Sequence, residues 1–179
     1  MRLVGFPGRI AIAATACAVL AYPGTASELQ DLVSRYGPPL EACYAQAHDT
    51  PSRKACVGLL SGACVEQEEG GGTTLGISMC SQTETDVWDA ILNAEYRQTM
   101  TWAKQRDAQE GPEFPAFANR ADVLRNAQRA WIAFRDAECE LEYSLWGAGS
   151  MRHIAGSSCL MQQTAQRAIE LRAKREDFE

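Results

Sequence analysis

The sequence is poor in the residues and motifs that carry most enzyme chemistry. It has only two histidines, His48 and His153, and it lacks both the nucleophile elbow of serine hydrolases and the glycine-rich loops that bind nucleotides. No segment after the N-terminus approaches the roughly 20 apolar residues of a membrane helix, and no sustained period-two alternation predicts a strand. We therefore expect a non-enzymatic protein with no cofactor, no metal and no transmembrane segment.

Residues 1–26 have the pattern of a secretory signal peptide. Arg2 and Arg9 precede an apolar run, and small residues at Gly24 and Ala26 suit cleavage after Ala26. A lipoprotein anchored through Cys17 is the minor alternative. Residues 27–179 are then a single domain with 15 basic and 23 acidic side chains, a formal charge of −8. We expect a periplasmic or secreted location, and the acidic surface disfavours nucleic acid as a partner.

Six cysteines remain after the signal peptide, and an even number in an exported domain predicts three disulfides. Six cysteines allow 15 pairings. The order along the chain favours Cys43–Cys56, Cys64–Cys80 and Cys139–Cys159. A zinc site formed by His153 with the last pair fits no common ligand spacing, so a disulfide is preferred there.

The cysteine-rich N-terminal part, residues 27–80, reads as short helices. The first is expected over 28–36, because Gly37, Pro38 and Pro39 should end it. Two more are expected over 40–47 and from Pro51 toward Cys64. Residues 66–72 combine acids with three glycines and predict a loop.

The long-helix core, residues 81–179, has apolar residues at three- and four-residue steps. One helix is expected from Ser81, with Glu84 completing a capping box, to about Gln109. The second follows Pro115 and Asn119, and the third begins within 154–158. The predicted fold is all-α, three long helices in a small bundle with a disulfide-tied short-helix N-terminal part.

Two segments are candidate partner-binding sites. The turn between the last two helices carries a hydroxyl, a guanidinium and an imidazole on a rigid hairpin, an arrangement that supports a presented loop as well as an ordinary turn. The residues are Gly149, Ser150, Arg152 and His153. The acidic run Glu66, Glu68 and Glu69 could bind a cationic partner, although a plain connector is the preferred interpretation there.

Two further sets of polar residues have simple structural interpretations. Glu138 and Glu142 lie four apart on one helical face, but a glycosidase needs a cleft between its two acids, so a solvated face is preferred. The second set could form a polar recognition patch, but the preferred interpretation is that it clamps the long helices together through ion pairs and hydrogen bonds. It comprises Asp89, Asn93, Tyr96, Arg129, Arg135 and Asp136.

Four motifs along the chain are Trp88-Asp89-x-x-Leu92-Asn93-x-x-Tyr96, Ala127-Gln128-Arg129-Ala130-Trp131-Ile132-x-Phe134-Arg135-Asp136-x-x-Cys139, Gly149-Ser150 and Cys159-x-x-x-x-Thr164-x-x-Arg167. Together they resemble the LprI-like lysozyme-inhibitor family of exported bacterial proteins. The likeness spans about Cys64 to Leu171, and the acidic insertion at 66–72 departs from it. The resemblance implies a helical, disulfide-bonded envelope protein and, for the namesake, inhibition of c-type lysozyme.

Three functions are compatible with the sequence. The leading hypothesis is an inhibitor that docks on a basic, lysozyme-like muramidase, because an acidic protein with a cationic loop complements a basic enzyme with acids in its cleft. The second is an envelope protein–protein interaction module without lysozyme activity. The third, a cell-wall hydrolase, would require Glu138 and Glu142 to act as a catalytic pair.

Overall fold

The computed structural model describes residues 24–178, and all regular secondary structure in that stretch is helical. The all-α prediction is therefore confirmed. The elements are α1 (Gly24–Gln46), α2 (Thr50–Lys54), α3 (Leu59–Gln67), α4 (Thr74–Glu110), a 3-10 turn η1 (Pro115–Phe117), α5 (Arg120–Ser144) and α6 (Met151–Glu176). Most of the predicted signal peptide, Cys17 included, lies outside the described residues, and the predicted cleavage point after Ala26 falls within the first turn of α1.

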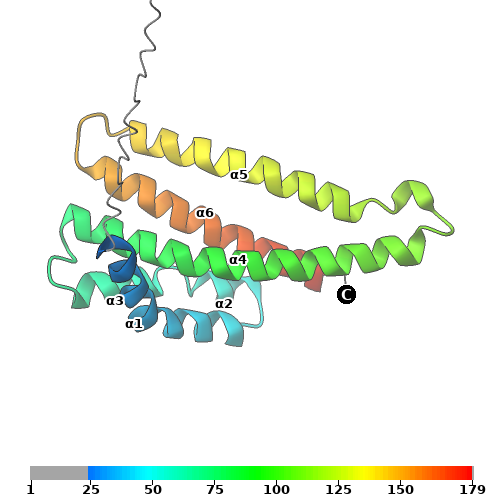
Figure 1. Ribbon diagram of the computed structural model, residues 1–179, viewed down its shortest axis with the longest axis horizontal. Helices are drawn as coiled ribbons and strands as arrows, with labels where there is room; N and C mark the ends of the chain where they lie inside the picture. The colour runs from blue at the N-terminus through cyan, green and yellow to red at the C-terminus, as the bar shows by residue number, and fades with distance from the viewer. Residues whose placement is uncertain (1–23, 179) are drawn as a thin grey trace, which may run out of the picture.

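The helices form three layers (Figure 1). The long helices α4 and α6 pack together in the middle, α5 lies across one side of this pair, and α1, α2 and α3 cover the other side. The core forms between α1, α3, α4 and α6 and includes Leu40, Leu60, Trp88 and Ile169, each almost fully buried. Because α1, α2 and α3 cover the opposite side of α4 and α6, α5 packs against other helices on one side only within residues 24–178.

The predicted break at Gly37, Pro38 and Pro39 is wrong, because α1 runs through both prolines. A proline inside a helix costs about 3 kcal/mol through its missing N–H and its ring. Four large side chains at four-residue spacing face the core on either side of this point, and each contributes roughly 1.5–3 kcal/mol when buried. They are Leu32, Tyr36, Leu40 and Tyr44. A straight α1 keeps all four buried, which outweighs the lost hydrogen bonds.

The prediction of one continuous helix from Pro51 toward Cys64 is also wrong. This segment is divided into α2 and α3 at Gly58, whose φ of 93° lies in the left-handed region that favours glycine. The loop expected over 66–72 is shorter, since α3 includes Glu66. The turn that follows is tight, because a Cβ on Gly71 would lie 2.4 Å from the Val65 carbonyl oxygen.

Helix α4 begins seven residues before the expected start at Ser81. Thr73 is its N-cap and accepts a hydrogen bond from the Gly76 N–H at 3.1 Å. The predicted capping box at Ser81 and Glu84 is therefore wrong, since both residues lie inside the helix. Glu84 is instead fully buried and accepts hydrogen bonds from Gly58 N–H, Ser61 N–H and Trp88 Nε1–H at 2.7, 2.8 and 2.9 Å. Its carboxylate joins α3 to α4.

The start of α5 is fixed by a residue of the preceding helix. Asp107, near the end of α4, accepts hydrogen bonds from the backbone N–H groups of Arg120 at 3.0 Å and Ala121 at 2.9 Å. Partial burial opposes ionisation, but these bonds and the Arg120 guanidinium lower the pKa of Asp107. The expected helix boundary at Asn119 is right, although the cap comes from Asp107.

Candidate functional site

The α5–α6 hairpin is locked close to its turn. The Cys139–Cys159 disulfide joins the two helices, and the structure also pairs Cys43 with Cys56 and Cys64 with Cys80, the order expected from the sequence. Nearer the turn, Tyr143 of α5 packs on Gly156 of α6, where an added Cβ would lie 3.2 Å from the Tyr143 ring. A covalent bond and a close helix contact therefore support the turn.

Arg152 is held over this turn by three contacts. Its Nη1 donates to the Gly147 carbonyl at 3.3 Å, its Nε donates to His153 Nε2 at 3.4 Å, and its guanidinium stacks on the Tyr143 ring, 5.4 Å from the centroid. Gly147 adopts a φ of 54°, which lets the chain reverse directly after α5. Helix α6, the third of the long helices, starts at Met151 and not within 154–158 as expected. Arg152 and His153 therefore belong to its first turn.

His153 is exposed, and its backbone carbonyl is anchored within α6 and to α4. Its carbonyl oxygen accepts hydrogen bonds from Ser157 Oγ at 2.8 Å and from Ser78 Oγ of α4 at 3.4 Å. Its ring packs edge-on against Tyr143, with centroids 5.5 Å apart. A small cavity of about 390 Å³ lies beneath, with His153, Tyr143 and Asp136 among its lining residues. The turn therefore presents an ordered basic and aromatic surface.

Tyr143, Gly156 and Ser78 also belong to this surface, and the sequence did not predict them. No motif marks them, because each contributes only after α4, α5 and α6 are brought together. A glycine inside an otherwise regular helix was the available signal, since such a residue is often retained for close packing. Gly149 and Ser150 lie in the exposed turn itself.

The acidic segment is divided between two roles. Glu68 forms an ion pair with Arg35 and accepts a hydrogen bond from Tyr36 Oη at 2.7 Å, so it ties the α3–α4 turn to α1. The Tyr36 hydrogen bond, aided by Arg35, lowers the pKa of Glu68. Glu66 and Glu69 remain exposed. Figure 1 shows the α3–α4 turn and the α5–α6 turn at the same end of the bundle, a proximity that sequence alone did not predict.

The polar residues expected to clamp the long helices do not do so. Asn93 donates to Asp89 within α4 at 2.8 Å, and Arg135 pairs with Asp136 within α5 at 2.7 Å. Arg129 is exposed on α5, Tyr96 packs against the core, and Trp88 is fully buried within it. The clamp between α4 and α6 is instead the buried ion pair of Glu95 with Arg175, at 2.9 Å.

Trp131 is the main contact of α5 with the layer below. Its ring packs against the core and lies between two guanidinium groups, Arg135 of α5 at 5.1 Å and Arg167 of α6 at 5.7 Å from the centroid. Arg167 also donates from Nε to Gln128 at 3.0 Å. Trp131 therefore orients α5 on α6, and cation–π contacts add to the apolar packing.

The structure also shows where the residues of the two remaining candidates lie, the zinc site and the pair of acids. Cys139 and Cys159 are bonded to each other, which leaves His153 without the thiolates that a zinc site would need. No group of three or more metal-binding side chains occurs within residues 24–178. Glu138 and Glu142 line one small cavity of about 320 Å³ beside the disulfide, together with Gln162 and Gln163 of α6. Both carboxylates lie on the α5 wall of that cavity.

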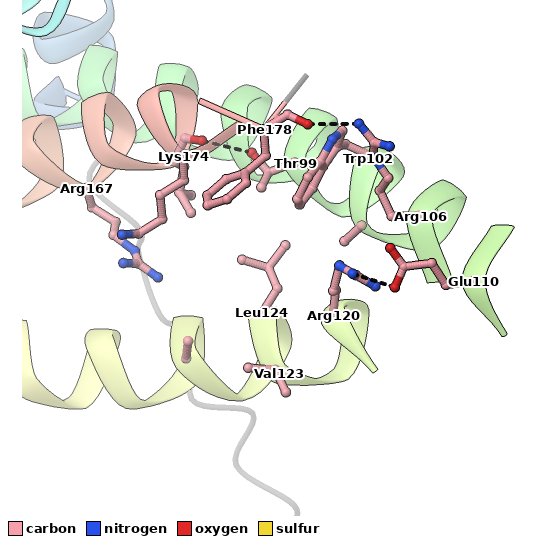
Figure 2. A pocket seen from close by; sticks show the side chains of 13 residues that line it. Thr99, Trp102, Arg106, Glu110, Arg120, Val123, Leu124, Arg167, Lys174 and Phe178 are labelled. Atoms are coloured by element: carbon pink, nitrogen blue, oxygen red, sulfur yellow. Dashed lines mark hydrogen bonds and ion pairs between the residues drawn. The ribbon is translucent and has the colours of Figure 1, made fainter. Parts of the chain in front are cut away.

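A larger recess of about 720 Å³ lies at the opposite end of the bundle, between the distal parts of α4, α5 and α6 (Figure 2). Trp102, Leu124 and Phe178 form much of its wall. Arg120 reaches across from α5 and pairs with Glu110 of α4 at 2.6 Å. Lys174 and Arg167 line it from α6. The recess forms only where the three helices pack together, so the periodicity of each helix alone did not reveal it.

The fold and the site together define a disulfide-stabilised helical protein of an oxidising, extracytoplasmic compartment, built around a locked hairpin. More specifically, the chain belongs to the LprI lysozyme-inhibitor family, because the family model "Lysozyme inhibitor LprI" matches residues 64–171. Those residues include α4, α5 and most of α6. No described helix has the length and apolar content needed to cross a bilayer.

Two curated relatives are similar to the chain, and the name of neither gives a function. The chain is 33% identical over 105 residues to the uncharacterized protein R02472 of Rhizobium meliloti (strain 1021), covering 59% of this chain and 76% of that protein. It is 31% identical over 110 residues to the uncharacterized protein YecT of Escherichia coli (strain K12), covering 57% and 65%. No solved structure matches the chain.

Proposed function

We propose that this protein is a non-enzymatic inhibitor of a lysozyme-like muramidase and that it docks through the α5–α6 turn. Family membership supports the inhibitor role. The observation that carries the choice of surface is the ordered Arg152, held by Gly147, His153 and Tyr143. A side chain that is already positioned loses less conformational entropy on binding.

The proposed contact places Arg152 at the acids of the muramidase cleft. Glycoside hydrolases of this type use a pair of carboxyl groups that flank the bond they cleave. A guanidinium has five N–H donors and pairs well with a carboxylate. Arg152 uses one donor on Gly147 and one on His153 in the free protein, so it retains donors for a carboxylate of the enzyme.

The exposed acids at the same end supply a second contact. Glu66 and Glu69 lie on the α3–α4 side of that end, while Arg152 lies on the α5–α6 side. A basic enzyme with an acidic cleft offers the complementary pattern, with cations around the cleft and carboxylates within it. Such complementarity increases the association rate and fixes the orientation of the complex.

The test is inhibition of cell-wall lysis by c-type lysozyme, using the mature oxidised protein at low salt. We expect Arg152→Glu to raise the concentration needed for half-inhibition at least tenfold. Arg97→Glu on α4 is the matched control, because Arg97 is exposed and the change in net charge is the same; its effect should stay below about threefold. No inhibition by the wild-type protein at micromolar excess would refute the inhibitor role. Equal effects of the two variants would refute the turn as the contact.

A further inference from the structure

The recess between the distal parts of α4, α5 and α6 has the size and lining of a small-molecule site (Figure 2). Its volume of about 720 Å³ lies within the range of such sites, roughly 300–1,000 Å³. Trp102 contributes to it from α4, Leu171 from α6, and Val123 and Ala127 from α5. Most of the remaining lining residues are basic, so an apolar wall is combined with a charged rim.

The recess is elongated along the helices. On α4, its lining residues extend from Thr99 to Glu110, which is three helical turns or roughly 16 Å. On α6, the residues Arg167, Leu171 and Lys174 are four and three positions apart, so they share one face of that helix. An apolar slot of this form suits an extended chain better than a compact ring.

The charge of the recess is opposite in sign to that of the whole molecule. The recess is lined by four bases and one acid, although the chain after the predicted cleavage point has a formal charge of −8. The acid, Glu110, is already paired with Arg120 at 2.6 Å. The other three bases are Arg106, Arg167 and Lys174. An excess of bases at one place in an acidic protein favours an anionic ligand there.

Two of these bases have no carboxylate partner within residues 24–178. Lys174 is exposed and forms no ion pair or hydrogen bond with the described residues. Arg106 donates from Nη2 to the Phe178 carbonyl at 2.8 Å, and this acceptor carries no formal charge. Arg167, in contrast, is paired with Glu170 at 3.5 Å. Lys174 is therefore the cation at the recess that is most available to a ligand, and Figure 2 shows it extending from α6 toward α5.

We propose that the recess binds an anionic amphiphile with a single alkyl chain, of the fatty-acid class. The alkyl chain lies in the slot against Trp102, Leu124 and Leu171, and the carboxylate pairs with Lys174 at the rim. A neutral apolar ligand leaves this cation unpaired, and a basic protein is repelled by it. The inference is independent of the proposed function, because the recess lies at the end of the bundle opposite to the α5–α6 turn and its binding is measured without lysozyme.

The experiment is isothermal titration calorimetry of the mature oxidised protein with dodecanoate. We expect one site with a dissociation constant on the order of 10–100 μM. Decanoate should bind roughly tenfold more weakly, because it buries two fewer methylene groups. Dodecyltrimethylammonium has the same chain with a cationic head and should bind at least tenfold more weakly than dodecanoate, although the net charge of the protein favours it.

Two pairs of variants locate the site. Lys174→Glu should weaken dodecanoate binding at least fivefold, whereas Lys104→Glu on α4, outside the recess and with the same change in net charge, should change it less than twofold. Ala127→Phe places a ring at the recess and should also weaken binding at least fivefold, whereas Ala130→Phe on the same helix, outside the recess, should not. All four positions are exposed, so far-UV circular dichroism and the melting temperature should remain close to wild type.

The proposal is overturned if dodecanoate does not bind at about 1 mM, or if dodecyltrimethylammonium binds equally well. It is also overturned if the two members of either pair of variants weaken binding equally, because the amphiphile would then bind elsewhere. Sedimentation of the ligand-free protein tests another occupant. A dimer that is lost in Ala127→Phe but kept in Ala130→Phe would assign the recess to a second copy of the chain and contradict the proposal.

Discussion

At the scale of single residues, buried acids hold the helices together. Glu84 is fully buried, yet its carboxylate is satisfied by donors from three positions, two of them backbone N–H groups at the start of α3. Glu95 plays a similar part beside α6, where it pairs with Arg175 and accepts a hydrogen bond from Tyr44 Oη at 3.1 Å. Buried charges of this kind are costly to leave without their partners.

Replacing Glu84 by alanine should therefore destabilise the protein strongly. Glu84→Ala leaves the N–H groups of Gly58, Ser61 and Trp88 without an acceptor in a dry site, and we expect a loss of about 3 kcal/mol in the free energy of unfolding. Urea denaturation, monitored by circular dichroism, measures this free energy. Glu66→Ala, at an exposed position, should change the same quantity by less than about 0.5 kcal/mol. Similar losses in both variants would contradict the role assigned to the Glu84 carboxylate.

Tyr44 should make stability sensitive to alkaline pH. Burial, reinforced by the nearby Glu95 carboxylate, raises the pKa of Tyr44 well above its usual value near 10. The folded protein thus retains the phenol proton above pH 10, while the unfolded chain releases it, so the stabilisation present below about pH 10 is lost as the pH rises. In Tyr44→Phe this contribution is absent. Guanidinium denaturation at pH 8 and pH 10.5 should show a smaller decrease for the variant than for wild type.

At the scale of secondary-structure elements, α5 depends on a few contacts with the rest of the chain. The Asp107 cap holds its start, Trp131 supports its middle, and the disulfide from Cys139 holds its end. Much of the remaining surface of the helix is exposed. The α5–α6 hairpin is therefore the region where the loss of a single contact should have the largest local effect.

Removal of the Cys139–Cys159 bond should loosen this hairpin first. A disulfide that closes a loop of about 20 residues contributes about 3 kcal/mol by restricting the unfolded chain. In Cys139→Ser/Cys159→Ser we expect a lower melting temperature and faster amide hydrogen exchange over 140–158. Exchange in the buried middle of α4, around Trp88, should change less. Uniform acceleration across both regions would show that the bond stabilises the whole fold and not the hairpin in particular.

At the scale of the whole molecule, net charge governs the proposed encounter with a basic enzyme. The chain after the predicted cleavage point has a formal charge of −8, and attraction between opposite charges accelerates association. We expect inhibition to weaken as ionic strength rises from about 20 to 300 mM, since the Debye length falls to several ångströms in that range. Surface plasmon resonance should attribute most of the change to the association rate. A salt-independent association rate would exclude electrostatic steering.

The helices of the family region could be predicted because their periodicity is local. Apolar residues at three- and four-residue steps predicted α4, α5 and α6 as long helices, and glycines and prolines located most of their ends. The errors concern positions where tertiary contacts outweigh local preference. Helix α1 crosses Pro38 and Pro39 because Tyr36 and Leu40 on either side are both buried in the core.

The candidate surface was predictable only in part. Arg152 and His153 are recognisable from sequence as polar residues in a turn, but their partner Tyr143 and the support from Ser78 depend on three helices meeting. The apolar rhythm of α5 was visible as well, although the sequence did not separate residues that face inward, such as Trp131, from residues that face outward, such as Phe134.

The sequence by itself determined the helical class, the family and a disulfide order in which each cysteine pairs with the next one along the chain, because these features depend on neighbouring residues. The tertiary structure decided which charges are buried, which ends of the helices meet and which face of α5 remains exposed. These features depend on free energies of burial between residues far apart in the chain. The periodicity of a helix shows that an apolar face exists, but only packing decides what covers it.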